Sequence, residues 1–442
     1  MSQNQAHNHP WRRRIGGGVG AAFALGALSW VLVHSTTWAG PLFANTLRSV
    51  IGTDNVAHLE DFVYAIEDRV TRIRRRGEKP QAHWAVPEPK PNHVAPAATS
   101  DAGPAWPAFE PKAVGPVHKS WSAPGDGQWV TVEDPRHAEA PVAMYKTLVH
   151  PDPNRSWGEL FVVAIDLEQT DLHAAAGTHE PKAEAPIPKD FARPGRVPPA
   201  EHAALVAAFN GGFMAEHGHY GMLVNGVTLV KPRDLSCSVI GYHDGTVEVA
   251  TWKSVSHAAD RMDWFRQTPA CMFENNVMHV GLRHPETRLW GATLDGDTVI
   301  RRSAIGLDES RRVLYVGIGN NMTARALAEG MHHCGAIDVA QLDVNWSYPK
   351  FLTYGIGKDG ELEARALMDG FEFTPGDYVT KSAFRDFFYV TRRAAPRASH
   401  APTQSTERVP ESGGDAGIRA AAVAPKTPTT GTLAAPCPSC PK

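Results

Sequence analysis

The chain has 442 residues, of which 42% are hydrophobic, and its 44 Lys and Arg residues nearly balance 47 Asp and Glu residues, for a formal net charge of -3. This apolar content can form a sizeable core, so an entirely disordered chain is excluded. The near-neutral charge argues against a nucleic-acid-binding protein, and five cysteines are too few for a scaffold built on disulfides.

The N-terminus has the pattern of a membrane anchor. Residues 1–14 are polar and end in three arginines, and residues 15–33 carry no charge. This run of about 19 residues is close to the length that crosses a bilayer. We therefore predict a cytoplasmic segment at 1–14 and an uncleaved transmembrane signal-anchor at 15–34, oriented by the arginines. A cleaved signal peptide is the alternative, and both place the rest of the chain outside the cytoplasm.

Residues 47–76 are predicted to form a membrane-proximal amphipathic helix. Apolar residues recur there at steps of three and four, and the segment ends in a basic run, Arg72 and Arg74–Arg76. Packing of this helix on the domain or on a second copy of itself is the first interpretation. Binding of the arginines to a membrane surface is the second.

Two segments have biased composition. Residues 79–116 are rich in Pro and Ala and are predicted to be an extended linker. Residues 394–442 are rich in Ala, Pro, Thr and Ser and are predicted to be a disordered tail. The tail ends in Cys437-Pro-Ser-Cys440, which we interpret as a thiol pair or a local disulfide.

The remaining residues, 117–393, are predicted to form the globular domain. Its fold class is α+β, with a mainly β-sheet core and a few packed helices. One helix is expected from Thr323 to Cys334, ended by Gly335. Apolar runs and turn residues predict strands at Leu160–Leu167, Ala203–Phe209, Met222–Val230 with a turn at Asn225-Gly226, Ser236–Tyr242, Val247–Trp252, Val313–Ile318 and Val339–Val344.

The domain contains three cysteines with different expected states. Outside the cytoplasm, Cys237 and Cys271 can form a disulfide. Cys334 lies on the apolar face of the predicted helix, where a buried thiol is expected.

Three strand ends carry polar residues that suit a binding or catalytic site. In Asn210-Gly211-Gly212, the glycines leave backbone N–H groups open to a ligand, although a tight turn explains the same pattern. Arg302 can donate two hydrogen bonds to a phosphate, although such an arginine is more often a surface ion-pair partner. Asp343 ends a buried strand, where it can act as an acid, a base or a metal ligand, or bond the following turn.

The order of these motifs resembles the phosphodiester glycosidase domain family. The matching pieces span about residues 140–390 and are N-G-G-F at 210–213, G-x-x-V-N-G at 221–226, R-S-A-I-G at 302–306, the helix at 323–336 and L-D at 342–343. The resemblance implies a β-rich α+β fold and hydrolysis of a sugar-1-phosphodiester of the envelope or an exopolysaccharide.

The resemblance also implies roles for individual residues. Asp343 would be the catalytic carboxylate and Arg302 would hold the phosphodiester. Substrate would be bound by Asn210, Gly211, Gly212 and Asn345. Glu274 and Asp338 are candidates for a second carboxylate.

The sequence departs from the family in two places. L-D-V-N-W-S replaces a glycine-rich L-D-G-G-G-S, and Gly319-Asn320-Asn321 replaces D-G-R. A non-catalytic glycan-binding or envelope scaffold protein with the same fold is therefore the alternative function. A metal-dependent hydrolase using His217 and His219 is a third hypothesis. No cofactor is expected, and the expected partners are a glycan or sugar-phosphodiester ligand and the membrane, with no nucleic acid.

Overall fold

A computed structural model describes residues 53–86, 109–284, 289–290, 298–345 and 347–394. The predicted anchor at 15–34 and the tail from 395 onward lie outside these residues. Among the described helices, none combines the length and the apolar character needed to cross a bilayer.

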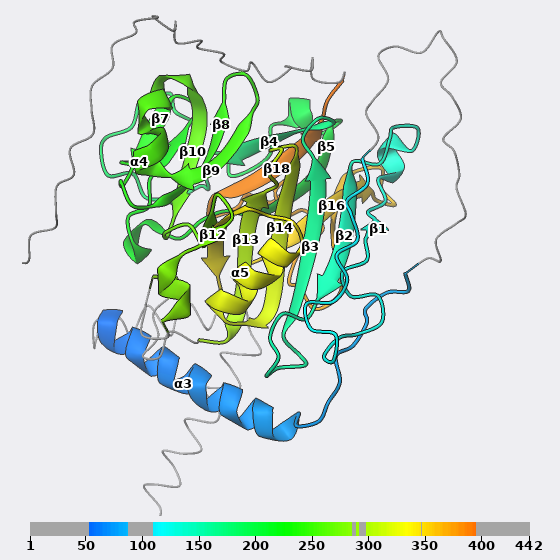
Figure 1. The fold of residues 1–442 in the computed structure, drawn as a ribbon. Coiled ribbons are helices and arrows are strands. Elements are labelled where there is room, and N and C mark those ends of the chain that lie inside the picture. Colours follow the sequence, from blue (N-terminus) through cyan, green and yellow to red (C-terminus); the bar gives the residue numbers. More distant parts are fainter. Residues whose placement is uncertain (1–52, 87–108, 285–288, 291–297, 346, 395–442) are drawn as a thin grey trace, which may run out of the picture. The chain divides into compact units, whose positions relative to one another are not determined.

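The described part of the domain is built from three antiparallel sheets (Figure 1). The largest has the order β1-β2-β3-β14-β13-β15-β11-β12. Its strands are β1 (Val130–Thr131), β2 (Met144–Val149), β3 (Glu159–Asp166), β14 (Val313–Met322), β13 (Ile300–Leu307), β15 (Asp338–Val344), β11 (Phe273–Glu274) and β12 (Val277–Met278).

Two smaller sheets have five strands each. One contains β7 (Val227–Val230), β6 (Met222–Val224), β10 (Met262–Thr268), β8 (Cys237–Tyr242) and β9 (Val247–Thr251). The other contains β17 (Leu362–Ala366), β16 (Phe351–Ile356), β5 (Leu205–Asn210), β18 (Phe387–Arg392) and β4 (Thr170–Ala175).

The helices in the described residues are few, as the α+β prediction requires. They are α3 (Thr53–Arg74), α4 (Trp252–Val255) and α5 (Ala324–His333). Short 3-10 helices lie at Pro135–His137, Pro199–Glu201, Ala215–His217, Ser256–Arg261 and Val280–Arg283. The β-rich α+β class is confirmed for this part of the chain.

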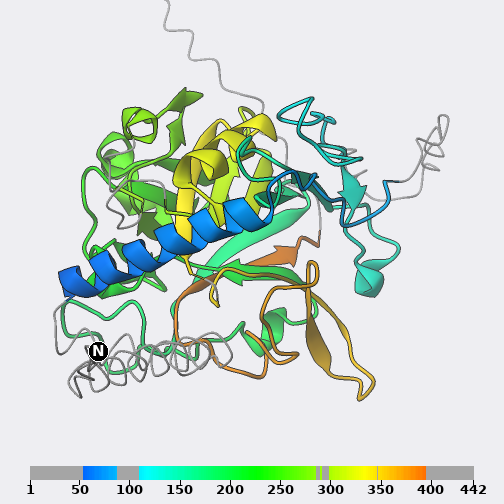
Figure 2. The same ribbon diagram turned by 90° about the horizontal axis from the view of Figure 1, so that it is seen from below.

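The strand β3 is buried on both faces of the large sheet, which explains why it is a continuous apolar run in the sequence. In β3, Phe161 and Val163 belong to a core shared with both smaller sheets, whereas Leu160 and Val162 pack with residues of α5. Side chains alternate between the two faces of a strand, so both sets must be apolar. Figure 2 shows α5 (yellow) and the hairpin of β16 and β17 (amber) on opposite sides of this sheet.

The seven predicted strand segments coincide with β3, β5, the pair β6 and β7, β8, β9, β14 and β15, whereas the other ten strands of the described residues were not predicted. Asn225 and Gly226 form the turn between β6 and β7 at φ values of 49° and 72°. The helix α5 begins after Thr323, whose side chain accepts a hydrogen bond from the Ala326 N–H at 3.0 Å. It is followed by Gly335 in the left-handed region at φ 117°.

Both ends of the predicted linker contact the domain. The described residues of this segment, 79–86 and 109–116, contain no helix or strand. However, His83 lies 2.7 Å from a carboxylate oxygen of Glu159, and the ring of Phe109 meets that of Tyr145. The packed region therefore extends beyond the predicted start at residue 117.

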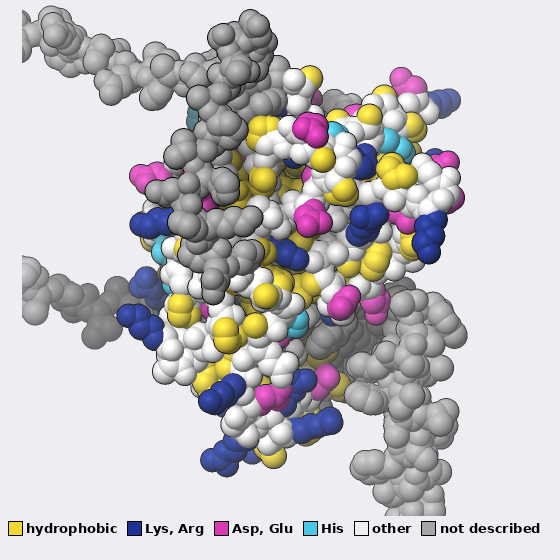
Figure 3. Space-filling model, turned by 90° about the vertical axis from the view of Figure 1, so that its right-hand side faces the viewer, with side chains coloured by type: hydrophobic (Ala, Val, Ile, Leu, Met, Phe, Trp, Pro, Cys, Tyr) yellow, Lys and Arg dark blue, Asp and Glu magenta, His cyan; other side chains and the backbone are white. Residues whose placement is uncertain are grey.

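The predicted disulfide is confirmed: Cys237 and Cys271 are bonded, at a sequence separation of 34. Cys334 is a buried free thiol, and burial raises its pKa well above the ordinary value. The face of the molecule in Figure 3 intersperses Lys and Arg with Asp and Glu and shows no continuous basic patch.

We expect the double variant Cys237→Ala/Cys271→Ala to lower the free energy of unfolding by about 3–4 kcal/mol, because the disulfide restricts a loop of this length in the unfolded chain. Urea unfolding followed by tryptophan fluorescence measures the change. Reductant should shift the midpoint of the wild type and leave that of the double variant unchanged. Equal midpoints for the two oxidised proteins would contradict this stabilisation.

Candidate functional site

The site is built where strands of two sheets end beside one another. The Asp343 N–H donates to the Gly211 carbonyl at 3.1 Å, which joins β15 to the segment after β5. The Ser303 hydroxyl donates to the Asp343 carbonyl at 2.8 Å and accepts from the Asn210 amide at 2.8 Å. The structure thus brings Asn210, Gly211 and Asp343 together, although they lie far apart in sequence.

An irregularity in β15 decides where Asp343 points. Ala304 pairs with Gln341 and Arg302 with Val344. The two pairs are two residues apart in β13 but three apart in β15, so β15 contains one extra residue here. In a regular strand, Asp343 would face the same way as Gln341. The extra residue allows its side chain to turn toward the residues before β18, as β-bulges near functional sites commonly do.

Asp343 is a buried carboxyl group, with 2% of the residue exposed. Its carboxylate accepts a hydrogen bond from the Val344 N–H at 2.8 Å and forms an ion pair with Arg385. Burial raises the pKa of Asp343 to about 6, although the Arg385 charge opposes this change. A carboxyl group whose pKa lies near neutrality can exchange protons under physiological conditions.

Arg385 is the cation of this site and the part that reaches solvent. Its side chain is 22% exposed, whereas that of Asp343 is 3% exposed. The guanidinium also lies over the ring of Tyr348, 4.5 Å from its centroid. An arginine held on one side by a carboxylate and an aromatic ring keeps a planar donor group in a fixed orientation.

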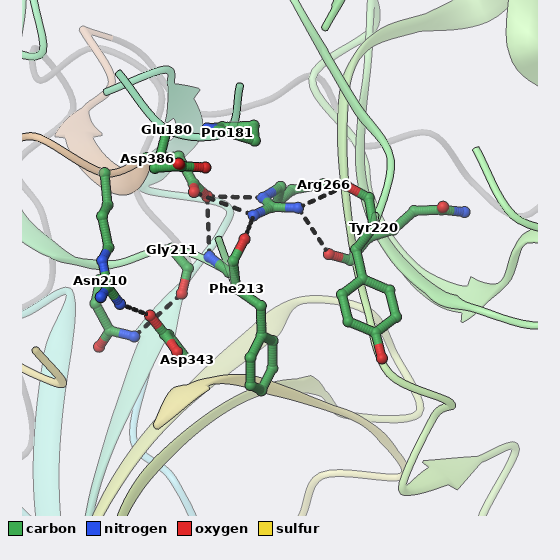
Figure 4. A network of polar contacts seen from close by, with 12 residues as sticks. Glu180, Pro181, Asn210, Gly211, Phe213, Tyr220, Arg266, Asp343 and Asp386 are labelled. Carbon is green, nitrogen blue, oxygen red and sulfur yellow. Dashed lines mark hydrogen bonds and ion pairs between the residues drawn. The ribbon is translucent and has the colours of Figure 1, made fainter. Parts of the chain in front are cut away.

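A second ion pair, between Asp386 and Arg266, lies beside Asp343 and Gly211 (Figure 4). Asp386 and Arg266 are 2% and 0% exposed, and they are joined by two hydrogen bonds of 2.8 Å and 3.1 Å. The remaining Arg266 donors bind the carbonyl groups of Phe213, Tyr220 and Gln267. This pair is enclosed, and its hydrogen bonds hold the segments around Phe213, Tyr220 and Gln267 together.

Gly211 and Gly212 lie against the Asp386–Arg266 ion pair and do not face an open space. A Cβ at Gly211 would lie 2.2 Å from an Asp386 carboxylate oxygen, and one at Gly212 would lie 2.8 Å from Cζ of Arg266. The Gly211 N–H donates to the Asp386 carbonyl at 3.1 Å, and the Gly212 N–H donates to its carboxylate at 2.9 Å. The N–H groups expected to face a ligand therefore bind Asp386.

The side chain of Asn210 also forms hydrogen bonds within the protein. Its residue is 1% exposed, and its amide oxygen accepts from the Lys350 N–H at 3.1 Å. With its NH₂ group bonded to Ser303 and to the Gly211 carbonyl, it joins three segments of the site. In this structure the Asn210 side chain positions the strand ends.

Arg302 does not contact Asp343, which corrects the expected grouping. Its side chain is enclosed and donates to carbonyl groups of Trp290, Thr298 and Met322 at 2.6–3.0 Å. It also binds the amide oxygen of Gln341, on the face of β15 from which Asp343 turns away. The sequence could not show this, because the irregular register separates the two side chains.

The other predicted site residues take separate positions. Asn345 is exposed and in the left-handed region at φ 141°, directly after β15. Asp338 lies at the opposite end of β15 and accepts from the Asn275 N–H, and Glu274 binds Thr251. The carboxylate that neighbours Asp343 is instead Asp386, whose charge helps to raise the Asp343 pKa.

The histidine pair shows no metal-binding arrangement. His219 lies 3.2 Å from a carboxylate oxygen of Glu184, and His217 lies 3.8 Å from one of Glu216. Within the ranges that the structure describes, no group of three or more His, Cys, Asp or Glu side chains is placed to hold a metal ion.

Sequence analysis missed Arg385, Asp386 and Arg266. A signal was present for the first two: Arg385-Asp386 directly precedes the apolar strand Phe387–Val390, the same arrangement of polar residues at a strand end that singled out Asn210 and Asp343. For Arg266, the signal was an arginine within an otherwise buried strand.

The fold and site together define a β-rich α+β protein with a buried carboxylate–arginine centre. No protein-family model matches the chain, and a search of the curated proteins finds no match. Solved structures that resemble it include the zebrafish N-acetylglucosamine-1-phosphodiester alpha-N-acetylglucosaminidase catalytic domain, auto-inhibited by its pro-peptide. That likeness has 12% identity and a TM-score of 0.37, and it covers 60% of this chain and 88% of the other.

Two further structures are similar to the chain at comparable levels. A hypothetical protein from Synechocystis has 12% identity and a TM-score of 0.32, covering 58% of this chain and 65% of its own. A putative exported protein from Burkholderia pseudomallei has 10% identity and a TM-score of 0.26, covering 58% and 76%. Likenesses of this size do not assign an activity, so the function must be argued from the site itself.

Proposed function

We propose that this protein is an extracytoplasmic hydrolase that cleaves a sugar-1-phosphodiester, with Asp343 and Arg385 as its reacting pair. The observation that carries the proposal is the buried Asp343 carboxyl group, whose pKa is about 6, in contact with an arginine that reaches solvent. Carboxyl groups with raised pKa values in the company of a specific charged partner are typical of catalytic sites.

The chemistry matches these two groups. Water adds to the anomeric carbon, the bond from that carbon to the phosphate oxygen breaks, and a free sugar and a phosphomonoester leave. The ionised carboxylate of Asp343 accepts the proton of the attacking water, or stabilises the positive charge at the anomeric carbon. The Arg385 guanidinium neutralises the charge of the departing phosphate. This assigns to Arg385 the role that the resemblance implied for Arg302.

The compartment is part of the proposal. The Cys237–Cys271 disulfide supports an oxidising environment outside the cytoplasm. The uncharged run at 15–33, preceded by arginines, supports attachment through a membrane anchor. Protease treatment of intact and of permeabilised cells tests this, because an extracytoplasmic domain is cut without permeabilising the inner membrane.

A glycan-binding protein without catalysis is the second candidate. One observation favours it: the donors of Asn210, Gly211 and Gly212 all have internal partners, and Asp386 is held by Arg266. A second free carboxylate is therefore not evident among the described residues of the site. Such a protein would bind the sugar phosphodiester and release it unchanged.

We expect the purified full chain to release reducing sugar from a UDP-sugar or a chromogenic sugar-1-phosphodiester, and Arg385→Gln to lower kcat/KM by about 10²- to 10³-fold because a donor to the developing charge is lost.

The matched control is Asp166→Asn. Asp166 is also a buried carboxylate with one arginine partner, Arg312 at 3.0 Å, but it lies at the end of β3 away from the site. This variant should keep wild-type turnover at a temperature where it is folded. If the wild type shows no turnover but binds the same compound saturably, the proposal of a hydrolase is wrong and that of a glycan-binding protein is supported.

A further inference from the structure

The helix α3 presents an apolar stripe to solvent. The exposed fractions of Val63, Ile66, Val70 and Ile73 are 37%, 48%, 57% and 71%. Large apolar side chains at a surface usually occur singly, whereas these four lie in one line along the helix. Such a line on a helix indicates a contact with another molecule or segment.

The opposite face of α3 is already bound to the domain. Asp68 forms two hydrogen bonds of 2.7 Å with the guanidinium of Arg155, and both side chains are largely buried. At 100° per residue, Asp68 lies roughly 180° around the helix from the middle of the stripe. The helix therefore contacts its own domain through its polar side and leaves its apolar side open.

The spacing of the stripe is that of a coiled coil. The sequence repeats apolar residues at alternating steps of three and four, at Val56, Leu59, Val63, Ile66, Val70 and Ile73. The a and d positions are all apolar over about three heptads, as in a coiled coil, and Phe62 adds one apolar residue at a g position. Valine occupies each a position, and the d positions hold Leu59, Ile66 and Ile73, so every a and d position carries the kind of apolar side chain that a coiled coil buries.

We propose that α3 is a dimerisation helix, whose stripe packs against the same stripe of a second copy of this chain. A lipid surface is a poorer occupant, because interfacial helices carry a wide apolar face, whereas this stripe follows the a and d positions. Glu67 and Arg74 lie beside the stripe on one side and Arg69 on the other, so its borders carry charges of both signs. The second copy brings an identical stripe, as an interface related by two-fold symmetry requires.

The contact area between the two apolar stripes, which we call the seam, limits the affinity of the dimer. A helix of 22 residues is about 33 Å long, and its contact residues are fewer than the 20–30 a side of a standard interface. The dimer should therefore be reversible in solution. If residues 15–34 anchor the chain, two copies in one membrane have a high effective concentration, which favours the same contact.

Sedimentation velocity of the full chain in neutral detergent tests the proposal. Over about a hundredfold range of concentration, we expect the protein mass to rise from one chain of 47.9 kDa toward two. Ile66→Asp should raise the dissociation constant by at least about tenfold, because a carboxylate would enter the seam. Ala65→Asp, at the neighbouring exposed position outside the stripe, should leave it unchanged.

Circular dichroism of both variants should match the wild type, since both positions are exposed. A single-chain mass at every concentration would overturn the proposal, as would an equal effect of the two substitutions. Neither result depends on the hydrolase activity, so failure of the dimer and failure of the proposed function are distinguishable.

Discussion

Replacing Asp343 with Asn should abolish most hydrolysis while leaving the protein at least as stable as the wild type at pH 8. Loss of a catalytic carboxylate costs about 10²- to 10⁴-fold in kcat. The stability expectation follows from burial, because the folded protein disfavours the ionised carboxylate, and an amide of the same shape carries no such charge.

The pH dependence has a definite sign. The pKa of Asp343 is about 6 in the folded chain and about 4 when unfolded, so the folded protein binds this proton more tightly. Ionisation of Asp343 therefore does not affect the free energy of unfolding below about pH 4. It lowers this free energy progressively between about pH 4 and 6, and the full loss is reached above about pH 6. Two pKa units correspond to roughly 3 kcal/mol, an upper limit on the gain in Asp343→Asn because Arg385 loses its ionic partner.

Thermal unfolding from pH 4 to pH 8 measures this effect. The difference in Tm between Asp343→Asn and the wild type should shrink toward acid pH, and the wild-type kcat should fall below about pH 6 as Asp343 is protonated. Asp166→Asn is again the control, since it removes a buried carboxylate at the end of β3 that lies away from the site. A rate that is flat from pH 4 to 8 would exclude Asp343 as the titrating catalytic group.

Replacing Asp386 with Ala should destabilise the fold by roughly 3–5 kcal/mol, because it leaves the Arg266 charge buried without a partner. The Gly212 N–H loses its acceptor in the same variant. Urea unfolding measures the change. Glu329→Ala removes an exposed ion pair with Arg325 in α5, and it should cost less than about 1 kcal/mol.

A double variant separates the effect of the unpaired charge on stability from the effect of lost packing. Arg266→Met combined with Asp386→Leu removes both charges and fills similar space, so it should recover part of the lost stability. If Asp386→Ala unfolds at the same urea concentration as Glu329→Ala, the enclosed ion pair does not hold the site together.

Two of the predicted site residues share one local signal, a polar residue at the end of an apolar strand. Asn210 and Asp343 each follow an apolar strand, and the structure places them in one hydrogen-bonded cluster with Ser303 between them. The arginine partner of Asp343 was not anticipated, because Arg302 lies within β13 and binds Gln341, whereas Arg385 precedes β18 in another sheet. The irregular register of β13 with β15 turns Asp343 away from the side on which Arg302 lies.

The sequence by itself indicated the β-rich α+β class, the helix α5 and seven strand segments, but not strands such as β10, β13 and β16–β18. Apolar runs, the Asn225-Gly226 turn, the Thr323 cap and Gly335 act within a few residues, so their signals can be recognised without the fold. The heptad spacing of α3 is equally local. Only the tertiary structure decided which charges meet. Arg266 and Asp386 are 120 residues apart, and a long-range ion pair depends on the packing of whole sheets, which a linear pattern does not encode.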